Sequence, residues 1–189
     1  MIKNKEIVNC INKLNTPSDS IAEKYIQKLA KIGENAVPLL LESAQNPESP
    51  RIRKWSLQAL GAIGDIRAVP ILIEALDHEN MTIKLHAIRG LTRMKYKKAG
   101  KKIATLLKDK SGGIRSNAIA SLIELDAKAN TSEIPKCLKD PMWYIRQMAC
   151  NACGHFKIIK SKAILDRLAK KDERKAVRVA AQNALQKLA

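Results

Sequence analysis

The hydrophobic positions of the chain repeat with a period of about 31 residues. An aliphatic anchor recurs with spacings of 31, 31, 31, 31 and 32 residues, at Ile21, Ile52, Ile83, Ile114, Ile145 and Val177. A second apolar residue stands eight positions after each anchor, at Leu29, Leu60, Leu91, Leu122, Cys153 and Leu185. Residues spaced in this way lie on one side of a helix with about 3.6 residues per turn. The pattern predicts one amphipathic helix per repeat, which we call the B helix.

Second apolar segments lie between the B helices and predict a partner helix, the A helix, in each repeat. These segments cover residues 3–14, 35–45, 66–77, 97–109, 131–139 and 160–171. Two B helices have start signals, because Ser-Pro at 49–50 and Asp-Pro at 140–141 place an N-cap residue before a proline at the first helical position. Gly33 and Gly64 follow B helices, where a left-handed cap is expected.

A single helix pair cannot bury its apolar side, whereas stacked pairs share one continuous core. We therefore predict an all-α fold, a right-handed α-α superhelix (solenoid) of about six two-helix repeats. The prediction is one domain over residues 1–189, with the helices at 3–14 and 175–188 as caps. The approximate repeats are 1–33, 34–64, 65–95, 96–126, 127–157 and 158–189.

The segment from Ile52 to Leu72, with the core Ala-Leu-Gly-Ala-Ile-Gly-Asp over 59–65, resembles the short, armadillo-like HEAT repeats named after phycobilin lyases. The resemblance covers most of the chain and is strongest over 50–77. It implies a ladder between repeats, in which an Asp of the A–B turn pairs with an Arg at the start of the B helix. The matching residues, each six apart, are Asp109 and Arg115, Asp140 and Arg146, and Asp172 and Arg178.

Three repeats depart from this ladder. Pro47 stands at the Asp position of Arg53, and His78 stands at the Asp position of Lys84, with Asp77 one residue early. The first repeat lacks both partners. Because a partly buried Arg needs a carboxylate, we interpret the basic residues that follow the anchors as structural. They are Arg53, Lys84, Arg115, Arg146 and Arg178.

The arc of each B helix opposite its apolar side is expected to line a concave groove. The groove residues that we select are Trp55, His86, Arg89, Arg93, Tyr96, Asn117, Glu124, Asn151 and His155. Aromatic and Arg side chains dominate binding hot spots, so the groove predicts a protein partner, whose capture should be lost in a Trp55→Ala, Arg89→Ala double variant. The alternative for Trp55 is packing against the neighbouring repeat.

The net charge is +17, and it is unevenly distributed. Residues 1–94 hold 13 basic and 10 acidic residues, whereas residues 95–189 hold 22 basic and 8 acidic residues. The excess falls outside the predicted groove, on a basic edge represented by Lys97, Lys98, Lys101, Lys102, Lys160 and Lys162. Such an edge is expected either to bind nucleic acid without sequence readout or to be a solvated lysine-rich face.

The run Cys150-Asn-Ala-Cys153-Gly-His155 is similar to a metal or haem motif, but the repeat gives each thiol a core position. His155 is expected on another side of the helix. Cys137 likewise replaces an A-helix leucine. We expect no metal site and no cofactor.

No phosphate-loop, dinucleotide-binding or serine-hydrolase motif occurs in the sequence. The family that the chain resembles includes phycobilin lyase subunits, scaffolds and a DNA alkylpurine glycosylase, so the resemblance names no single function. A glycosylase-like activity would rest on Glu124, with Arg89 and Arg93 one repeat away, and is our third hypothesis. We expect a non-catalytic scaffold that is cytoplasmic, with reduced thiols, no signal peptide, no membrane span and no small-molecule substrate.

Overall fold

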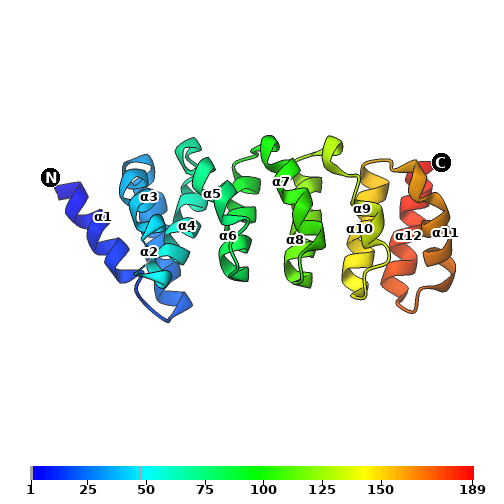
Figure 1. Cartoon of the computed structure of the whole chain (residues 1–189), viewed down its shortest axis with the longest axis horizontal. Helices are drawn as coiled ribbons and strands as arrows, with labels where there is room; N and C mark the ends of the chain where they lie inside the picture. Colours follow the sequence, from blue (N-terminus) through cyan, green and yellow to red (C-terminus); the bar gives the residue numbers. More distant parts are fainter. Residues whose placement is uncertain (1, 47) are drawn as a thin grey trace. The chain divides into compact units, whose positions relative to one another are not determined.

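The computed structural model describes residues 2–46 and 48–189, without the side chains of residues 2 and 3. Pro47, one of the predicted departures from the ladder, lies outside this part. The contacts of the chain define two compact units that meet in the sequence between Tyr96 and Lys97. Each unit consists of helix pairs (Figure 1). Whether residues 1–189 act as one domain stays a prediction.

Unit 1 contains three helix pairs. The A helices are α1 (Ile2–Lys13), α3 (Val37–Gln45) and α5 (Val69–Ala75), and the B helices are α2 (Asp19–Ile32), α4 (Pro50–Ile63) and α6 (Met81–Arg93). One-turn 3-10 helices, η1 (Gly33–Ala36) and η2 (Ile66–Ala68), precede α3 and α5. Each A helix packs on the B helix that follows it, and α4 also packs on α2 and α6.

Unit 2 repeats the arrangement. Its A segments are η3 (Lys97–Ala99) with α7 (Gly100–Thr105) and η4 (Leu106–Lys108), then η5 (Lys128–Asn130) with α9 (Ile134–Cys137), then η6 (Ile159–Ser161) with α11 (Lys162–Lys171). Its B helices are α8 (Gly112–Glu124), α10 (Trp143–His155) and α12 (Lys175–Leu188). The predicted all-α fold of the solenoid class is confirmed, since the described residues form these helices and their connecting turns.

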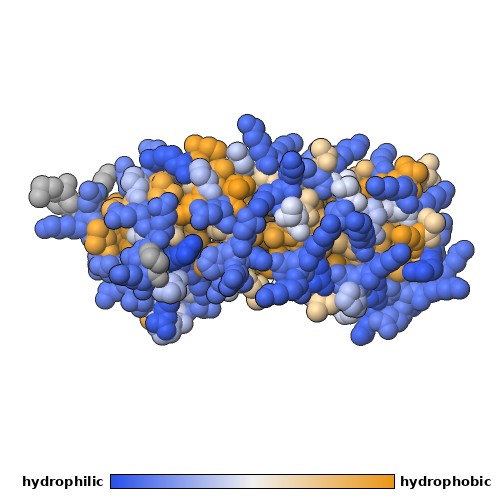
Figure 2. Space-filling model, viewed as in Figure 1, coloured by the Kyte–Doolittle hydropathy of each residue, from blue (hydrophilic) through white to orange (hydrophobic). Residues whose placement is uncertain are grey.

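The core follows the predicted period. The apolar residues eight positions after the anchors are fully buried in five repeats, at Leu29, Leu60, Leu91, Leu122 and Cys153. The anchors Ile83, Ile114, Ile145 and Val177 are buried as well. Ile21 is an exception at 47% exposure, because α2 packs on a B helix on only one side, which is α4. Hydrophilic side chains cover most of the face shown in Figure 2, with hydrophobic atoms visible between them.

The predicted Asp-Pro start of α10 is wrong. The helix begins at Trp143, two residues after Pro141, with Met142 at the N-cap. The carboxylate of Asp140 accepts a hydrogen bond from the Met142 amide at 2.9 Å and pairs with Arg115, so it stabilises the turn and the ladder instead of capping the helix. The start of α4 at Pro50 is confirmed, although Ser49 makes no capping hydrogen bond through its side chain.

Five B–A turns have a residue at positive φ with a regular spacing of 31 residues. The first two residues are Gly33 and Gly64, at 71° and 78°. Gly64 is the predicted left-handed cap, whereas Gly33 has a ψ of −140° and ends its helix outside the left-handed region. The next three are Lys95, Asp126 and Lys157, at 52°, 48° and 52°. A side chain with a Cβ is strained at such φ values by roughly 1–2 kcal/mol, so the turns at Lys95, Asp126 and Lys157 are less favourable than the turn at Gly64.

We expect Lys157→Gly to raise the free energy of unfolding by roughly 0.5–1 kcal/mol, because the relief of strain exceeds the entropy that glycine adds to the unfolded chain. Urea denaturation measures this change. Lys157→Ala is the matched control, since it removes the same charge but keeps the Cβ. An equal gain in both variants would assign the effect to charge repulsion and not to the backbone.

Candidate partner-binding face

The B helices of unit 1 form a small pocket on the side that faces away from the A helices. This groove pocket has a volume of about 140 Å³, and its lining comes from α2, α4 and α6. The lining residues are Glu23, Ile26, Gln58, Gly61, Ala62, His86, Arg89, Gly90 and Arg93. Three of the predicted groove residues therefore lie together, namely His86, Arg89 and Arg93.

Close backbone approach between α4 and α6 shapes the floor of the groove pocket. A Cβ placed on Gly61 would lie 2.8 Å from the Cα of Gly90 on the neighbouring helix, which only two glycines allow. The two helices therefore pack with their main chains almost in contact. As a result, side chains at the edges of this seam lie against the next repeat.

Trp55 and His86 are buried, at 6% and 8% exposure, so their prediction as exposed groove residues is wrong. Their ring centroids are 5.8 Å apart, and the Lys54 ammonium lies 3.6 Å from the centroid of the Trp55 ring. Trp55 and His86 both stand three positions after their anchors, on α4 and α6. Because these two helices approach closely, this position contacts the neighbouring repeat and does not face solvent. The alternative interpretation of Trp55, packing on the neighbouring repeat, agrees with the structure.

Polar side chains in the groove pocket retain unused hydrogen-bonding capacity. Gln58 donates its Nε2 to Glu23 at 2.9 Å, and Glu23 also accepts from Gln27 at 3.3 Å. The Oε1 of Gln58 and the Nε2 of His86 are buried without a hydrogen-bond partner in the described part of the chain. Buried polar atoms of this kind are rare, because each costs roughly 1–3 kcal/mol. Both atoms belong to residues that line the pocket, although the atoms themselves have almost no exposed surface.

The rim of the groove pocket is cationic. Arg89 and Arg93 are exposed and stand one helical turn apart on α6. Burial, followed by the charges of Lys54 and Arg89, lowers the pKa of His86 to about 4, so this imidazole is neutral at pH 7. The pocket therefore presents two guanidinium groups above a neutral floor, with one carboxylate, Glu23, engaged by amides.

The other predicted groove residues do not line this pocket. Tyr96 is half-buried at the end of unit 1. Asn117 donates its Nδ2 to the carbonyl of Gly113 at 2.8 Å, and His155 lies 3.8 Å from Asp126. Glu124 and Asn151 are exposed on α8 and α10. A groove that joins all nine residues stays a prediction.

Sequence reasoning left Glu23 out of the site, although the repeat contained the signal. Glu23 stands two positions after the first anchor, and this position belongs to the arc that faces away from the A helix. The rule that selects residues opposite the apolar side of each B helix also selects Glu23 when it is applied to the first repeat. Gln58 lies six positions after its anchor, on the same arc.

The basic edge lies entirely in unit 2. Lys97, Lys98 and Lys101 are exposed, Lys102 is half-buried, and Lys160 and Lys162 are exposed on η6 and α11. Unit 2 also contains a carboxylate that neutralises part of its positive charge, because Glu133 pairs with Lys108 and Lys136 at 2.9 Å. Hydrogen bonds from Lys108 and then Lys136 lower the pKa of Glu133.

The cysteines occupy core positions, as predicted. Cys150 and Cys153 are fully buried, and Cys137 is 5% exposed. Burial raises the pKa of Cys150 to about 12 and that of Cys137 to about 11, so both thiols are protonated at pH 7. His155 is exposed at the end of α10, and its Nε2 lies 3.8 Å from the Asp126 carboxylate, away from these sulfur atoms.

The ladder is present in unit 2, but its carboxylates come from the next repeat. Arg115 donates its Nε to Asp140 at 2.7 Å, and Arg146 donates its Nε to Asp172 at 2.8 Å. The residues six apart are joined through main-chain carbonyls, since the Nη1 of Arg115 donates to the oxygen of Asp109 at 2.8 Å. Arg178 likewise donates to the main-chain oxygen of Asp172 at 2.7 Å.

Stacked helix pairs joined by an inter-repeat ladder define a repeat scaffold of the α-solenoid class. A family model described as HEAT repeats matches residues 8–82, 69–135 and 106–186. The chain belongs to the HEAT repeat family. No curated protein sequence matches it. No helix in the described residues is long and apolar enough to cross a bilayer.

Solved structures confirm the fold at low sequence identity. An engineered protein has a TM-score of 0.68 and 16% identity, over 97% of this chain and 96% of its own. The complex of CpcE and CpcF of phycocyanin lyase from Nostoc sp. PCC7120 has a TM-score of 0.62 and 20% identity, over 90% of this chain and 73% of the matched chain. A designed armadillo repeat protein in complex with the peptide (KR)4 has a TM-score of 0.63 and 17% identity, over 97% and 100%. These similarities describe the fold alone.

Proposed function

We propose that the chain is a non-catalytic scaffold that binds an extended protein segment across the B helices of unit 1. The observation that carries the proposal is the groove pocket, in which two exposed guanidinium groups stand above buried, unpartnered polar atoms of Gln58 and His86. An extended main chain offers both N–H donors and carbonyl acceptors at regular spacing, so it can meet these atoms once the Gln58 and His86 side chains turn toward the pocket. The rest of the pocket provides apolar contact through Ile26 and Ala62.

The charge of the rim favours an acidic segment. Arg89 and Arg93 can each hold a carboxylate in a bidentate pair, and Lys54 adds positive charge behind them. A designed repeat protein of similar fold is bound to the basic peptide (KR)4, which has the opposite charge to the segment proposed here. The repeat scaffold thus supplies the shape, and the side chains on α6 select the sign of the charge.

A direct test uses purified protein and a displayed library of short peptides. We expect selected peptides to be rich in Asp and Glu, and we expect the Arg89→Ala, Arg93→Ala double variant to bind them about 10- to 100-fold more weakly by fluorescence anisotropy. The Lys5→Ala, Lys13→Ala double variant is the matched control, because it removes the same charge from exposed positions of α1. Equal affinities of the Arg89/Arg93 variant and the wild type would contradict the proposal.

Trp55→Ala is a poor test of binding, although the sequence suggested it as part of a double variant with Arg89→Ala. The side chain is 6% exposed, so its removal leaves a cavity between α4 and α6 and lowers stability together with any affinity. Variants of Arg89 and Arg93 avoid this ambiguity, since both side chains are exposed.

Nucleic-acid binding by the basic edge is the alternative, and a gel-shift assay at about 50 mM salt separates it from the first proposal. Charge reversal at Lys97, Lys98, Lys101 and Lys102 would abolish such binding and leave peptide binding by unit 1 intact. The glycosylase-like activity stays a hypothesis, because Glu124 lies on α8 of unit 2, whereas Arg89 and Arg93 line a pocket of unit 1.

A further inference from the structure

The ladder has a gap in unit 1, at Arg53 on α4. Arg53 follows its anchor by one residue, as Arg115 and Arg146 follow theirs. Each of those two guanidinium groups donates Nε and Nη2 to a carboxylate from the next A–B turn. Beside Arg53, the corresponding turn residue is His78, and the Nε of Arg53 is buried without a hydrogen-bond partner in the described residues.

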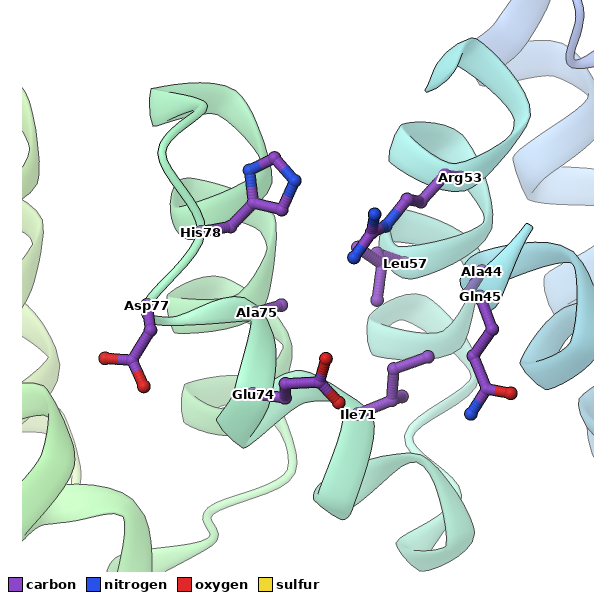
Figure 3. A pocket seen from close by; sticks show the side chains of 9 residues that line it. All are labelled: Ala44, Gln45, Arg53, Leu57, Ile71, Glu74, Ala75, Asp77 and His78. Atoms are coloured by element: carbon purple, nitrogen blue, oxygen red, sulfur yellow. The ribbon is translucent and has the colours of Figure 1, made fainter. Parts of the chain in front are cut away.

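A ladder Asp accepts a main-chain N–H of its turn and also pairs with an Arg, and His78 performs only the first of these two roles. Its Nδ1 accepts the main-chain N–H of Asn80 at 2.9 Å, as Asp140 accepts the N–H of Met142 at the same distance. An imidazole nitrogen that accepts a hydrogen bond carries no proton, so the ring proton is on Nε2. Figure 3 shows this edge of the ring on the side of the Arg53 guanidinium, and both residues line the same cavity. Arg53 thus lacks the acceptor that Asp140 gives to Arg115, and a second donor, the Nε2 of His78, borders the same cavity.

Two cavities border both Arg53 and His78. One cavity of about 390 Å³ is lined by Arg53, His78, Leu57 and Ile71, with Glu74 and Asp77 among its other residues. The carboxylate of Asp77 is directed away from the guanidinium (Figure 3). A second cavity of about 350 Å³ also borders Arg53 and His78, and its described lining contains the cations Arg51 and Lys54 and no carboxylate.

These charges favour a singly charged anion. The cations beside the second cavity attract a negative group toward Arg53. Glu74 and Asp77, on the other side, offset part of this attraction. The desolvation cost of an ion grows with the square of its charge, whereas the attraction grows only linearly, so a dianion gains less than a monoanion. A carboxylate has one negative charge and two acceptor oxygens, and it matches the fork of a guanidinium. A phosphate dianion matches the donors but has the larger desolvation cost.

We propose that Arg53 and His78 form a binding site for one carboxylate group, which completes the ladder from outside the chain. The ligand oxygens occupy the place beside Arg53 that the oxygens of Asp140 occupy beside Arg115. The group is either a small carboxylic acid or an aspartate side chain of a bound protein. The site does not depend on the groove pocket, because neither Arg53 nor His78 lines that pocket.

The repeat itself supplies the decisive variant, His78→Asp. It places a ladder carboxylate in the gap, so the ligand site is filled by the chain. We expect this variant to raise the Tm by roughly 2–6 °C without any ligand, because a buried bidentate ion pair forms. It should no longer respond to carboxylates. Arg53→Gln removes the guanidinium and should also abolish the response.

The measurement is the Tm of the full chain against sodium acetate, with ionic strength held constant by sodium chloride. At about ten times the dissociation constant, the wild type should gain roughly 3–5 °C and both variants should gain nothing. N-acetyl-aspartate amide tests the side-chain source of the same group, and inorganic phosphate tests the charge argument. A response to acetate alone identifies a small acid as the ligand, and a response to both compounds leaves the site open to a protein side chain.

Three results would overturn the site. They are no acetate response in the wild type, an equal response in Arg53→Gln, and a larger response to phosphate than to acetate. Proton–nitrogen NMR of the arginine Nε–H groups gives a readout that does not depend on stability. The resonance that is missing in Arg53→Gln should move as acetate is added to the wild type, and a fixed resonance would also contradict the proposal.

Discussion

Asp172→Ala is expected to lower the free energy of unfolding by roughly 3–5 kcal/mol, which is the largest effect that we predict for a single substitution. The Asp172 side chain is 4% exposed and accepts hydrogen bonds from Nε and Nη2 of Arg146 at 2.8 and 3.1 Å. Its Oδ1 also accepts the N–H of Arg174 at 3.0 Å. Alanine leaves a nearly buried guanidinium without its counter-ion and leaves a turn N–H without its acceptor.

Glu173→Ala is the matched control for this prediction. Glu173 also approaches Arg146, at 3.6 Å, but its side chain is 73% exposed. An exposed pair contributes little, so we expect a change below about 0.5 kcal/mol. Urea denaturation of both variants measures the contrast. Similar losses in the two variants would show that the ladder acts by general charge balance and not through its buried hydrogen bonds.

The same carboxylate makes unit 2 sensitive to acid. Burial alone would raise the pKa of Asp172, but hydrogen bonds from Arg146 and from the Arg174 amide outweigh it and hold the pKa below the ordinary 3.8. The folded state therefore binds this proton less readily than the unfolded state, so the stabilisation is present above the ordinary pKa and is lost as the pH falls below it. Asp172→Ala should remove this part of the pH dependence.

The repeat in the sequence was enough to predict the helix pairs, because the same core positions recur with little change. The sequence revealed the residues of the ladder but not which Asp side chain pairs with which Arg. Residues six apart in sequence are joined through the main-chain oxygen of the Asp. The pairing carboxylate of Arg115 is 25 residues away, at Asp140. Spacing along the chain does not reveal which of two neighbouring turns supplies the oxygen atoms.

The candidate site was predicted less well, and the reason is local packing. A helical wheel places Trp55 and His86 opposite the A helices, and it assumes that this side faces solvent. The assumption fails where two B helices approach closely, because the edges of the arc become contacts between repeats. Arg89 and Arg93 lie farther round α6 and stay exposed, so the wheel placed them correctly.

Gly61→Ala is expected to lower the free energy of unfolding by roughly 1–3 kcal/mol, although alanine favours a helix by about 1 kcal/mol. The new Cβ would lie 2.8 Å from the Cα of Gly90. Main-chain atoms cannot rotate away as a flexible side chain can, so α4 and α6 must separate. Gly113→Ala on α8 is the matched control, since its nearest neighbour is the Ser111 Oγ at 3.5 Å, and it should raise the free energy of unfolding by up to about 1 kcal/mol.

The separation of α4 and α6 should also be visible at Trp55, which packs between them. In a Trp143→Phe background, which leaves Trp55 as the single tryptophan, Gly61→Ala should shift the fluorescence emission to longer wavelength as water reaches the ring. Because Gly61 and Gly90 line the groove pocket, affinity for the selected peptides should fall in the same variant. An unchanged emission spectrum together with lower stability would show that the helices absorb the methyl group without opening, and affinity should then stay at the wild-type level.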